Sequence, residues 1–326
     1  MSIRLTKALR IFAVAMAVGS FSFAACAAFP DKPIRIIVTS AAGGNMDVLA
    51  RLMAAQMAKT LGQPVIVENV AGAGGLIALR LVSKQVPADG YTLLVSSNTA
   101  VLAPAFTKNP GYDPVKDLVG IGEMQTLPYV LLGPTSQGQK TVAEMIASAK
   151  AKPGSLTLAN GGIGTSTHLP ALMFAQQAGI DVVHVPYKGN SAALPDVVGG
   201  RADGYFDTAA VALEMMKEGR LRPYGVTSTK RMPQLPDVPT LAEQGLPNFN
   251  FTAYIALFAP AATPADVVKR LSEAIRAASK TEALREYFER SGSQPGTRSP
   301  EEFTAFIKQD AAAAAKVVSD LGIEKE

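Results

Sequence analysis

Cysteine and histidine are scarce in this sequence. It contains one cysteine, Cys26, and two histidines, His168 and His184, which do not have the spacing of metal ligands. No cysteine follows residue 28, which excludes disulfides, thiolate metal ligands and a cysteine nucleophile from that part of the chain. We therefore expect neither a metal site nor a bound cofactor, and folding must depend on a hydrophobic core.

The chain also lacks a strong charge of either sign. It has 31 Lys and Arg residues against 27 Asp and Glu residues, and Arg4, Lys7 and Arg10 all lie within the first ten positions. No run of basic residues follows, and the aromatic residues do not alternate with Lys or Arg as in surfaces that stack nucleic-acid bases. A nucleic-acid partner is not expected.

Recognisable catalytic motifs are missing as well. A serine hydrolase needs a Gly-x-Ser-x-Gly turn, which does not occur, and there is no paired-carboxylate motif. These absences favour a protein that binds its ligand without converting it, so we predict that it is not an enzyme. A hydrolase-type enzyme stays open as an alternative, because catalytic groups can converge in space without a sequence motif.

The first 28 residues have the layout of a signal peptide. Basic residues precede an uncharged apolar stretch over 11–25, and small residues then lead to the polar start at Phe29. This stretch is too short and too rich in small residues for a membrane span of about 20 strongly apolar residues. We predict secretion to the periplasm. Lipid anchoring through Cys26 stays open, because Ala24-Ala-Cys resembles the end of a lipoprotein signal.

Short β-branched runs alternate with amphipathic segments. Buried strands are predicted at 34–38, 65–68, 91–95, 156–159, 182–185 and 204–207. Such alternation is typical of an α/β fold, with mostly parallel sheets flanked by helices. Two longer extended stretches, 129–132 and 249–258, are interpreted as crossings between two lobes. Lobe 1 is predicted to comprise 29–128 plus 251–326, and lobe 2 to comprise 129–250.

Helix starts are marked by polar caps. A hydroxyl residue is followed three positions later by an acid, as in a capping box, at Thr141 with Glu144, Thr263 with Asp266, and Ser299 with Glu302. A further helix is predicted directly after Gly44, with Asn45 as its cap.

Two glycine-rich loops lie between a predicted strand and a helix. The first is Ser40, Ala41, Ala42, Gly43 and Gly44, and the second runs from Asn160 through Gly162, Gly164, Thr165 and Ser166 to His168. A helix start presents backbone N–H groups and about half a unit of positive charge, which suits an anion. Neither loop has a phosphate-loop or dinucleotide fingerprint, so a carboxylate is the predicted ligand.

Other polar residues near these loops are candidates with a structural alternative. Asp47 could contact the ligand or stabilise the first turn of its helix, and one hydroxyl of the second loop is expected to cap the helix there. Tyr187, Lys188 and Asp207 follow or end predicted strands, where they could line the cleft or lie solvated at its rim.

Motifs in order along the chain resemble the tripartite tricarboxylate transporter receptor family, the Bug-type periplasmic solute-binding proteins. They include Phe29-Pro-Asp-Lys-Pro-Ile, Ala41-Ala-Gly-Gly with Asp47, Asp89-Gly-Tyr-Thr-Leu-Leu, His184-Val-Pro-Tyr-Lys-Gly and Leu235-Pro-Asp-Val-Pro-Thr. The resemblance implies a type II, Venus-flytrap fold whose two lobes close on an organic acid. It implies that the two glycine loops hold the ligand carboxylate and that Ser97 and Asn98 belong to a further cleft loop.

This resemblance implies a transport role. The ligand would be a dicarboxylate, an aromatic acid or an acidic amino acid, and a monomeric receptor would deliver it to a membrane permease of a tripartite transporter. A sensor that presents the bound acid to a sensor kinase stays open as an alternative.

Overall fold

The structure is a computed structural model that describes residues 29–320 and 322–325. The predicted signal peptide and Cys26 lie outside these residues. Residues Lys32–Glu326 form one compact unit, to which the description below applies. None of the described helices combines the length and the apolar character that crossing a membrane requires.

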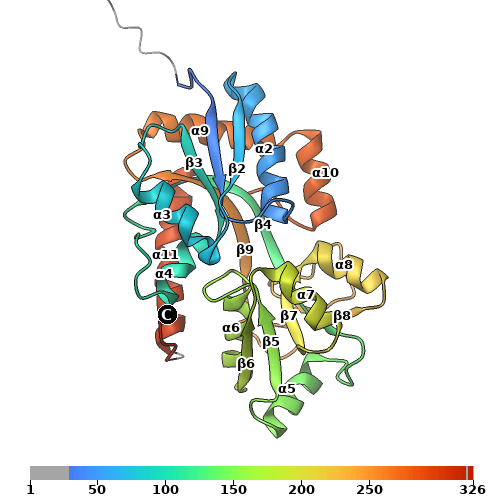
Figure 1. Ribbon diagram of the computed structural model, residues 1–326. Coiled ribbons are helices and arrows are strands. Elements are labelled where there is room, and N and C mark those ends of the chain that lie inside the picture. The colour runs from blue at the N-terminus through green and yellow to red at the C-terminus, as the bar shows by residue number, and fades with distance from the viewer. Residues whose placement is uncertain (1–28, 321, 326) are drawn as a thin grey trace, which may run out of the picture. The chain divides into compact units, whose positions relative to one another are not determined.

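Nine strands of the described chain join in one mixed sheet, in the order β2-β1-β3-β9-β4-β7-β5-β6, with β8 also paired to β4 (Figure 1). The pairs β1–β2, β1–β3, β5–β6 and β5–β7 are parallel, whereas every pair that involves β4 or β9 is antiparallel. The strands are β1 Ile34–Val38, β2 Val65–Asn69, β3 Thr92–Ser97, β4 Leu118–Pro134, β5 Leu156–Asn160, β6 Val182–Pro186, β7 Gly204–Thr208, β8 Leu221–Val226 and β9 Thr252–Pro260.

All six strands predicted from apolar runs are confirmed, with ends that differ by two residues at most. The two predicted crossings are also strands, β4 and β9, and β4 is much longer than the predicted 129–132. From Leu118 to Pro128, β4 pairs with β9, and from Tyr129 onward it pairs with β7 and β8. The fold is therefore the predicted two-lobed α/β architecture, with β4 and β9 as the long central strands.

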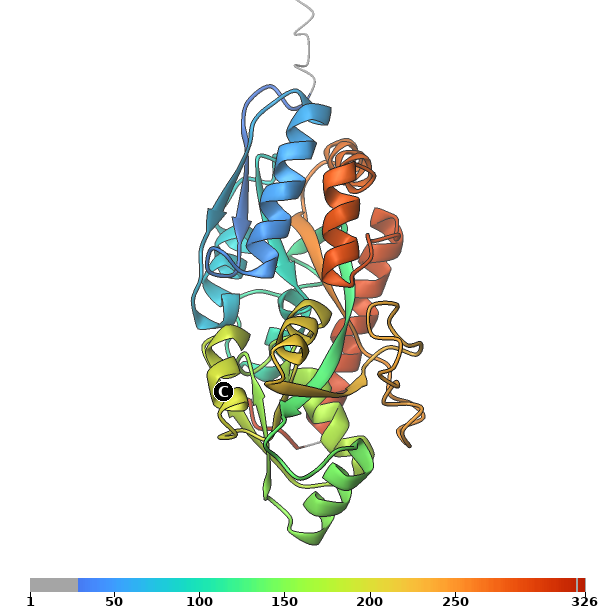
Figure 2. The same ribbon diagram turned by 90° about the vertical axis from the view of Figure 1, so that its right-hand side faces the viewer.

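Helices cover both faces of the sheet. They are α2 Asn45–Leu61, α3 Leu76–Lys84, α4 Thr99–Phe106, α5 Val142–Ala151, α6 His168–Ala178, α7 Asn190–Val198, α8 Ala209–Lys217, α9 Ala265–Ser279, α10 Glu282–Ser291 and α11 Pro300–Asp320. Figure 2 shows α2, in blue, beside the orange helices α9 and α10 of the C-terminal part. Sequence-distant segments thus complete one layer of lobe 1.

Two of the predicted helix caps are confirmed, and two are wrong. Thr141 and Ser299 accept hydrogen bonds from the backbone N–H groups of Glu144 and Glu302, both at 3.1 Å. The hydroxyl of Thr263 instead donates to the Pro260 carbonyl at 2.7 Å, and Pro264 is the cap residue of α9. The cap of α2 is Gly44, because the Asn45 side chain turns away to accept from the Tyr287 hydroxyl at 2.5 Å.

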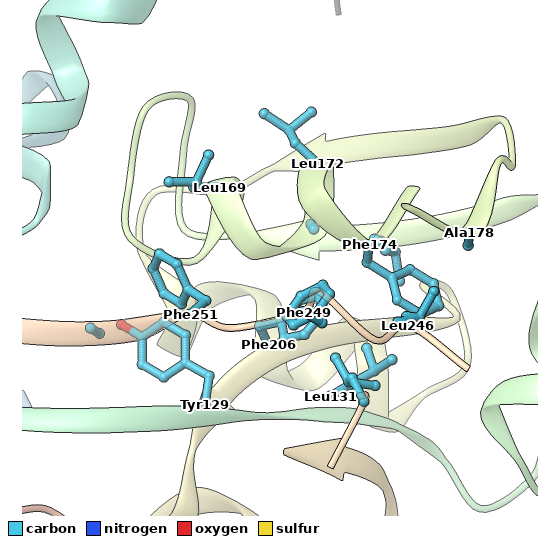
Figure 3. Packing of buried hydrophobic residues seen from close by; sticks show 14 of the residues in the cluster. Tyr129, Leu131, Leu169, Leu172, Phe174, Ala178, Phe206, Leu246, Phe249 and Phe251 are labelled. Carbon is cyan, nitrogen blue, oxygen red and sulfur yellow. The ribbon is translucent and has the colours of Figure 1, made fainter. Parts of the chain in front are cut away.

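An aromatic cluster forms the core of lobe 2 (Figure 3). Phe206 stacks on Phe249 with ring centroids 6.4 Å apart, and Tyr129 packs beside Phe251 at 5.9 Å. The same buried cluster contains Phe106 of α4 and Val318 of α11, which are helices of lobe 1. Apolar packing therefore continues from one lobe into the other.

Candidate functional site

The first glycine loop is held in shape by Asp47. Its carboxylate accepts from the backbone N–H of Gly43 at 2.9 Å and from the Asn69 amide at 2.9 Å, and forms an ion pair with Arg51 at 2.9 Å. The side chain is buried, and these donors lower its pKa, with Arg51 as the largest cause. The structure thus gives Asp47 a positioning role, and direct ligand contact by Asp47 stays a prediction.

The rest of this loop is open to solvent. Residues 41–44 are exposed, directly before the first turn of α2, and no side chain of the described residues caps that helix. The Asn69 amide, 3.0 Å from the Ser40 carbonyl, ties the end of β1 to β2. The loop therefore exposes its backbone to solvent, while Asp47 and Asn69 fix its conformation.

The second loop is organised by internal hydrogen bonds. The Gly161 amide donates to the Thr167 hydroxyl at 2.9 Å, the Gly162 amide donates to Asn160 at 2.9 Å, and the Thr165 hydroxyl donates to the Gly162 carbonyl at 2.6 Å. Gly162 and Gly164 have positive φ angles of 124° and 70°. Thr167 is the cap residue of α6, without a hydrogen bond from its side chain to that helix.

Both loops attach to strand β4, four residues apart. The side-chain amide of Asn45, directly after the first loop, donates to the side-chain oxygen (Oε1) of Gln125 at 3.4 Å. Ser166 of the second loop lies 2.9 Å from the Tyr129 hydroxyl. Four residues of strand span roughly 13 Å, and side chains four apart point to the same face. The two loops therefore flank one face of β4 at a separation suited to a small molecule.

Buried polar groups without a protein partner gather at these places. The Ser40 hydroxyl, the Gln125 side-chain nitrogen and the Asn160 side-chain nitrogen have no hydrogen-bond partner among the described residues. One belongs to the first loop, one to β4 and one to the start of the second loop. Buried polar groups are normally paired, so each of these three unpaired donors is a candidate contact for a ligand or a bound water.

Two of the predicted cleft residues form hydrogen bonds with neighbouring residues of the protein. Ser97 bonds the Thr99 hydroxyl at 3.0 Å, and Asn98 accepts from the backbone N–H of Tyr254 at 2.8 Å. Asn98 thus fixes β9 to the end of β3. Tyr187 donates its hydroxyl to Asp196 at 2.6 Å, and Lys188 is exposed beside it. Ligand contact by these four residues stays a prediction.

The remaining predicted residues are buried and titratable. His168 accepts from the Gly164 amide at 3.3 Å, and burial lowers its pKa to about 4, so the ring is neutral near pH 7. It lies 5.5 Å from the ring of His184, the strand residue. Burial raises the pKa of Asp207 to about 6, although the Thr208 amide donates to this carboxylate at 2.7 Å.

Sequence reasoning did not single out Gln125 or Asn190 as site residues, and marked Asn160 only as a loop start. The Asn190 side-chain oxygen is buried without a partner in the described structure, and a Cβ on Gly161 would lie 3.3 Å from it. These three side chains are identified as candidate site residues only by their contacts in the structure. Asn and Gln are common at loop ends, and no sequence motif marks them here.

Comparisons with known proteins relate this chain to a receptor family. A model of the tripartite tricarboxylate transporter family receptor matches residues 49–323. BugT of Bordetella pertussis is 34% identical over 296 residues, which are 90% of each chain. The structure of MatC from Rhodopseudomonas palustris with bound malate is 31% identical, with a TM-score of 0.81, over 89% of this chain and 100% of that one.

A second R. palustris structure, with adipate, has 29% identity and a TM-score of 0.83, over 91% of this chain and all of the other. The family model covers the second glycine loop, and its match begins a few residues after the first. With a matching family model, sequence relatives and fold, the chain belongs to the tripartite tricarboxylate transporter receptor family, whose members have the periplasmic binding protein fold.

Proposed function

We propose that this protein binds a small organic carboxylate between the two glycine loops. The observation that carries the proposal is the set of unpaired buried donors at Ser40, Gln125 and Asn160. A carboxylate supplies only acceptor oxygens, so it complements three donors that otherwise lose hydrogen bonds on burial. The exposed start of α2 adds backbone N–H groups and partial positive charge at the same place.

A dicarboxylate fits this arrangement best. The loops flank β4 at the roughly 13 Å spacing of four strand residues, and donors lie at both ends and between them. Malate and adipate, the ligands in two related structures, are both dicarboxylates. Aromatic acids and acidic amino acids remain in the proposed class, because the residues that would contact the far end of the ligand are not assigned.

The same proposal assigns the biological role. The chain would act in the periplasm as a monomeric receptor that delivers its acid to a tripartite-transporter permease and performs no chemistry on it. Residues 1–28 would be the cleaved leader. This role rests on family membership and on the sequence of those first residues.

Ligand-induced stabilisation tests the binding proposal. Malate and adipate should raise the unfolding temperature, and the uncharged diamides of the same acids should not. At a ligand concentration of 100 times Kd the free energy of unfolding should rise by about 2.7 kcal/mol.

Gln125→Leu should weaken binding by about tenfold, since a donor to a charged group is lost, whereas the exposed Gln85→Leu should bind normally. No stabilisation by any acid of a broad panel, or an unchanged affinity in Gln125→Leu, would contradict the proposal.

A further inference from the structure

A separate cavity of about 290 Å³ lies beside the two long central strands. It contains none of the residues predicted to bind the carboxylate. Its walls come from β4, β9, the segment before α11, and α11 itself: Glu123, Thr126, Thr252, Ala253, Tyr254, Thr297, Arg298 and Phe306. This volume is at the small end of those that hold small molecules in proteins. We call it the hinge pocket.

The hinge pocket and the glycine loops lie on opposite faces of β4. Gln125 and Thr126 are consecutive residues, so their side chains point to opposite sides of the strand. The β4–β9 register shifts between Glu123 and Gln125, and such a bulge inserts one residue and brings Glu123 to the face of Thr126. The pocket is therefore distinct from the candidate carboxylate site.

A buried carboxylate oxygen in this pocket has no partner. Glu123 is 3% exposed, and one of its oxygens accepts from the Arg298 guanidinium. The other oxygen is buried and lacks a hydrogen-bond partner within the described chain. Arg298 is in turn held over the Phe306 ring, with the guanidinium carbon 3.8 Å from the ring centroid. The free oxygen needs a donor, because burying an acceptor without a hydrogen bond is unfavourable.

Charge favours a cationic donor. Behind the pocket, the Tyr254 hydroxyl donates to Asp310 at 3.1 Å, and burial raises the Asp310 pKa to about 6, so this carboxyl is largely ionised at pH 7. Burial also raises the Glu123 pKa, whereas the charge and hydrogen bond of Arg298 lower it. Both carboxyls thus share the guanidinium of Arg298 as a counter-charge. The described residues contain no group of three or more His, Cys, Asp or Glu side chains that could hold a metal ion.

We propose that the hinge pocket is a second binding site, for a small primary ammonium ion whose N–H groups bond the free oxygen of Glu123. The hydroxyls of Thr126, Thr252 and Thr297 line the pocket and can accept the other N–H groups. Tyr254 and Phe306 offer aromatic walls, which suit the alkyl part of an organic cation. Because β4 and β9 connect the lobes, a ligand in this pocket would contact the strands about which the lobes would move.

Ethylammonium chloride is the probe that tests this site. Ligand-observed NMR should detect binding to the full chain in the millimolar range. Tetramethylammonium, which has the same charge but no N–H donor, should bind at least tenfold more weakly. Glu123→Gln keeps an oxygen for Arg298 but turns the free acceptor into a donor, so it should lower the ethylammonium affinity by about tenfold or more. Glu273→Gln on the exposed face of α9 makes the same charge change away from the pocket and should bind normally.

Glu123 is buried, so its substitution also tests folding, and Thr297→Leu provides an independent variant. Thr297 is exposed on the pocket rim, and the larger side chain should block the cavity without altering the core. Loss of binding in both variants, with retention in Glu273→Gln, supports the site. Equal binding of the two cations, normal affinity in Thr297→Leu, or no binding by the wild type would overturn it. Carboxylate binding is measured separately and does not depend on the result.

Discussion

At the scale of single residues, Asp47 shows how one carboxylate can hold a glycine loop in shape through its bonds to Gly43, Asn69 and Arg51. Asp47→Asn keeps the size of the side chain but removes the ion pair with Arg51 and weakens the bond from the Gly43 amide. We expect a loss of about 1–3 kcal/mol in the free energy of unfolding at pH 7, measured by urea denaturation. The exposed Asp237→Asn should cost little by comparison.

The pH dependence of this loss has a definite sign. Because the Asp47 pKa in the folded protein lies below the ordinary aspartate value of 3.8, its stabilising contribution is fully present above that value. It is lost as the pH falls through the lower, folded-state pKa. The gap between wild type and Asp47→Asn should therefore be constant from pH 5 to 7 and shrink below about pH 4. A gap that stayed constant into the acid range would contradict the assigned ion pair.

At the scale of elements, α9 and α11 begin with nearly the same sequence but are capped differently. Glu302 reaches back to the Ser299 amide at 2.7 Å and completes a capping box. Asp266 is one methylene shorter, and Thr263 bonds to Pro260 instead. Ser299→Ala should cost about 1 kcal/mol in thermal or urea unfolding, whereas Asp266→Ala should lose only the smaller dipole effect of about 0.3–1 kcal/mol. Equal losses from a matched pair of measurements would show that the box contributes nothing beyond the dipole.

Strands are predicted well from the sequence where they are short runs of apolar, β-branched residues. They are predicted poorly where glycine, proline or buried polar residues interrupt such a run. β1, Ile34–Val38, is apolar and buried apart from the exposed Arg35, and is predicted to the residue. The first half of β4 carries Gly120 and Gly122 as well as the buried Glu123 and Gln125, so it does not look like a strand. β8 contains Pro223 and Gly225 and was missed for the same reason.

The candidate site is likewise predictable from the sequence only in part. Glycine loops after strands are visible in the sequence, because a helix start after a buried strand has a local pattern. Gln125 is not visible, since its place between the loops depends on pairing between β4 and β9, which are more than a hundred residues apart. Likewise, Asp47 is recognisable as a first-turn acid, but its bond to Asn69 is a tertiary contact.

At the scale of the whole molecule, Gly164 marks a contact between the lobes. A Cβ at this position would lie 3.3 Å from the Ala103 Cα and 3.3 Å from the Phe106 Cβ, both on α4 of lobe 1. The Phe106 ring also lies 5.4 Å from that of His168, on the same side of lobe 2. This close packing against α4 leaves little room for a side chain at Gly164, so we expect closure of the lobes to depend on a glycine at this position.

Gly164→Ala should separate these effects when it is compared with Gly179→Ala. Both glycines have positive φ angles, 70° and 60°, so both substitutions bear a similar backbone strain of about 1–2 kcal/mol, but nothing lies within 4 Å of a Cβ at Gly179. If α4 limits closure, only Gly164→Ala should lower malate affinity, by about tenfold for a shift of roughly 1.4 kcal/mol toward the open state. Small-angle scattering at a malate concentration near the Kd of Gly179→Ala should then give a larger radius of gyration for Gly164→Ala than for Gly179→Ala. Identical affinities and radii for the two variants would mean that closure is set elsewhere, because the α4 contact would then tolerate a methyl group at no cost to the closed form.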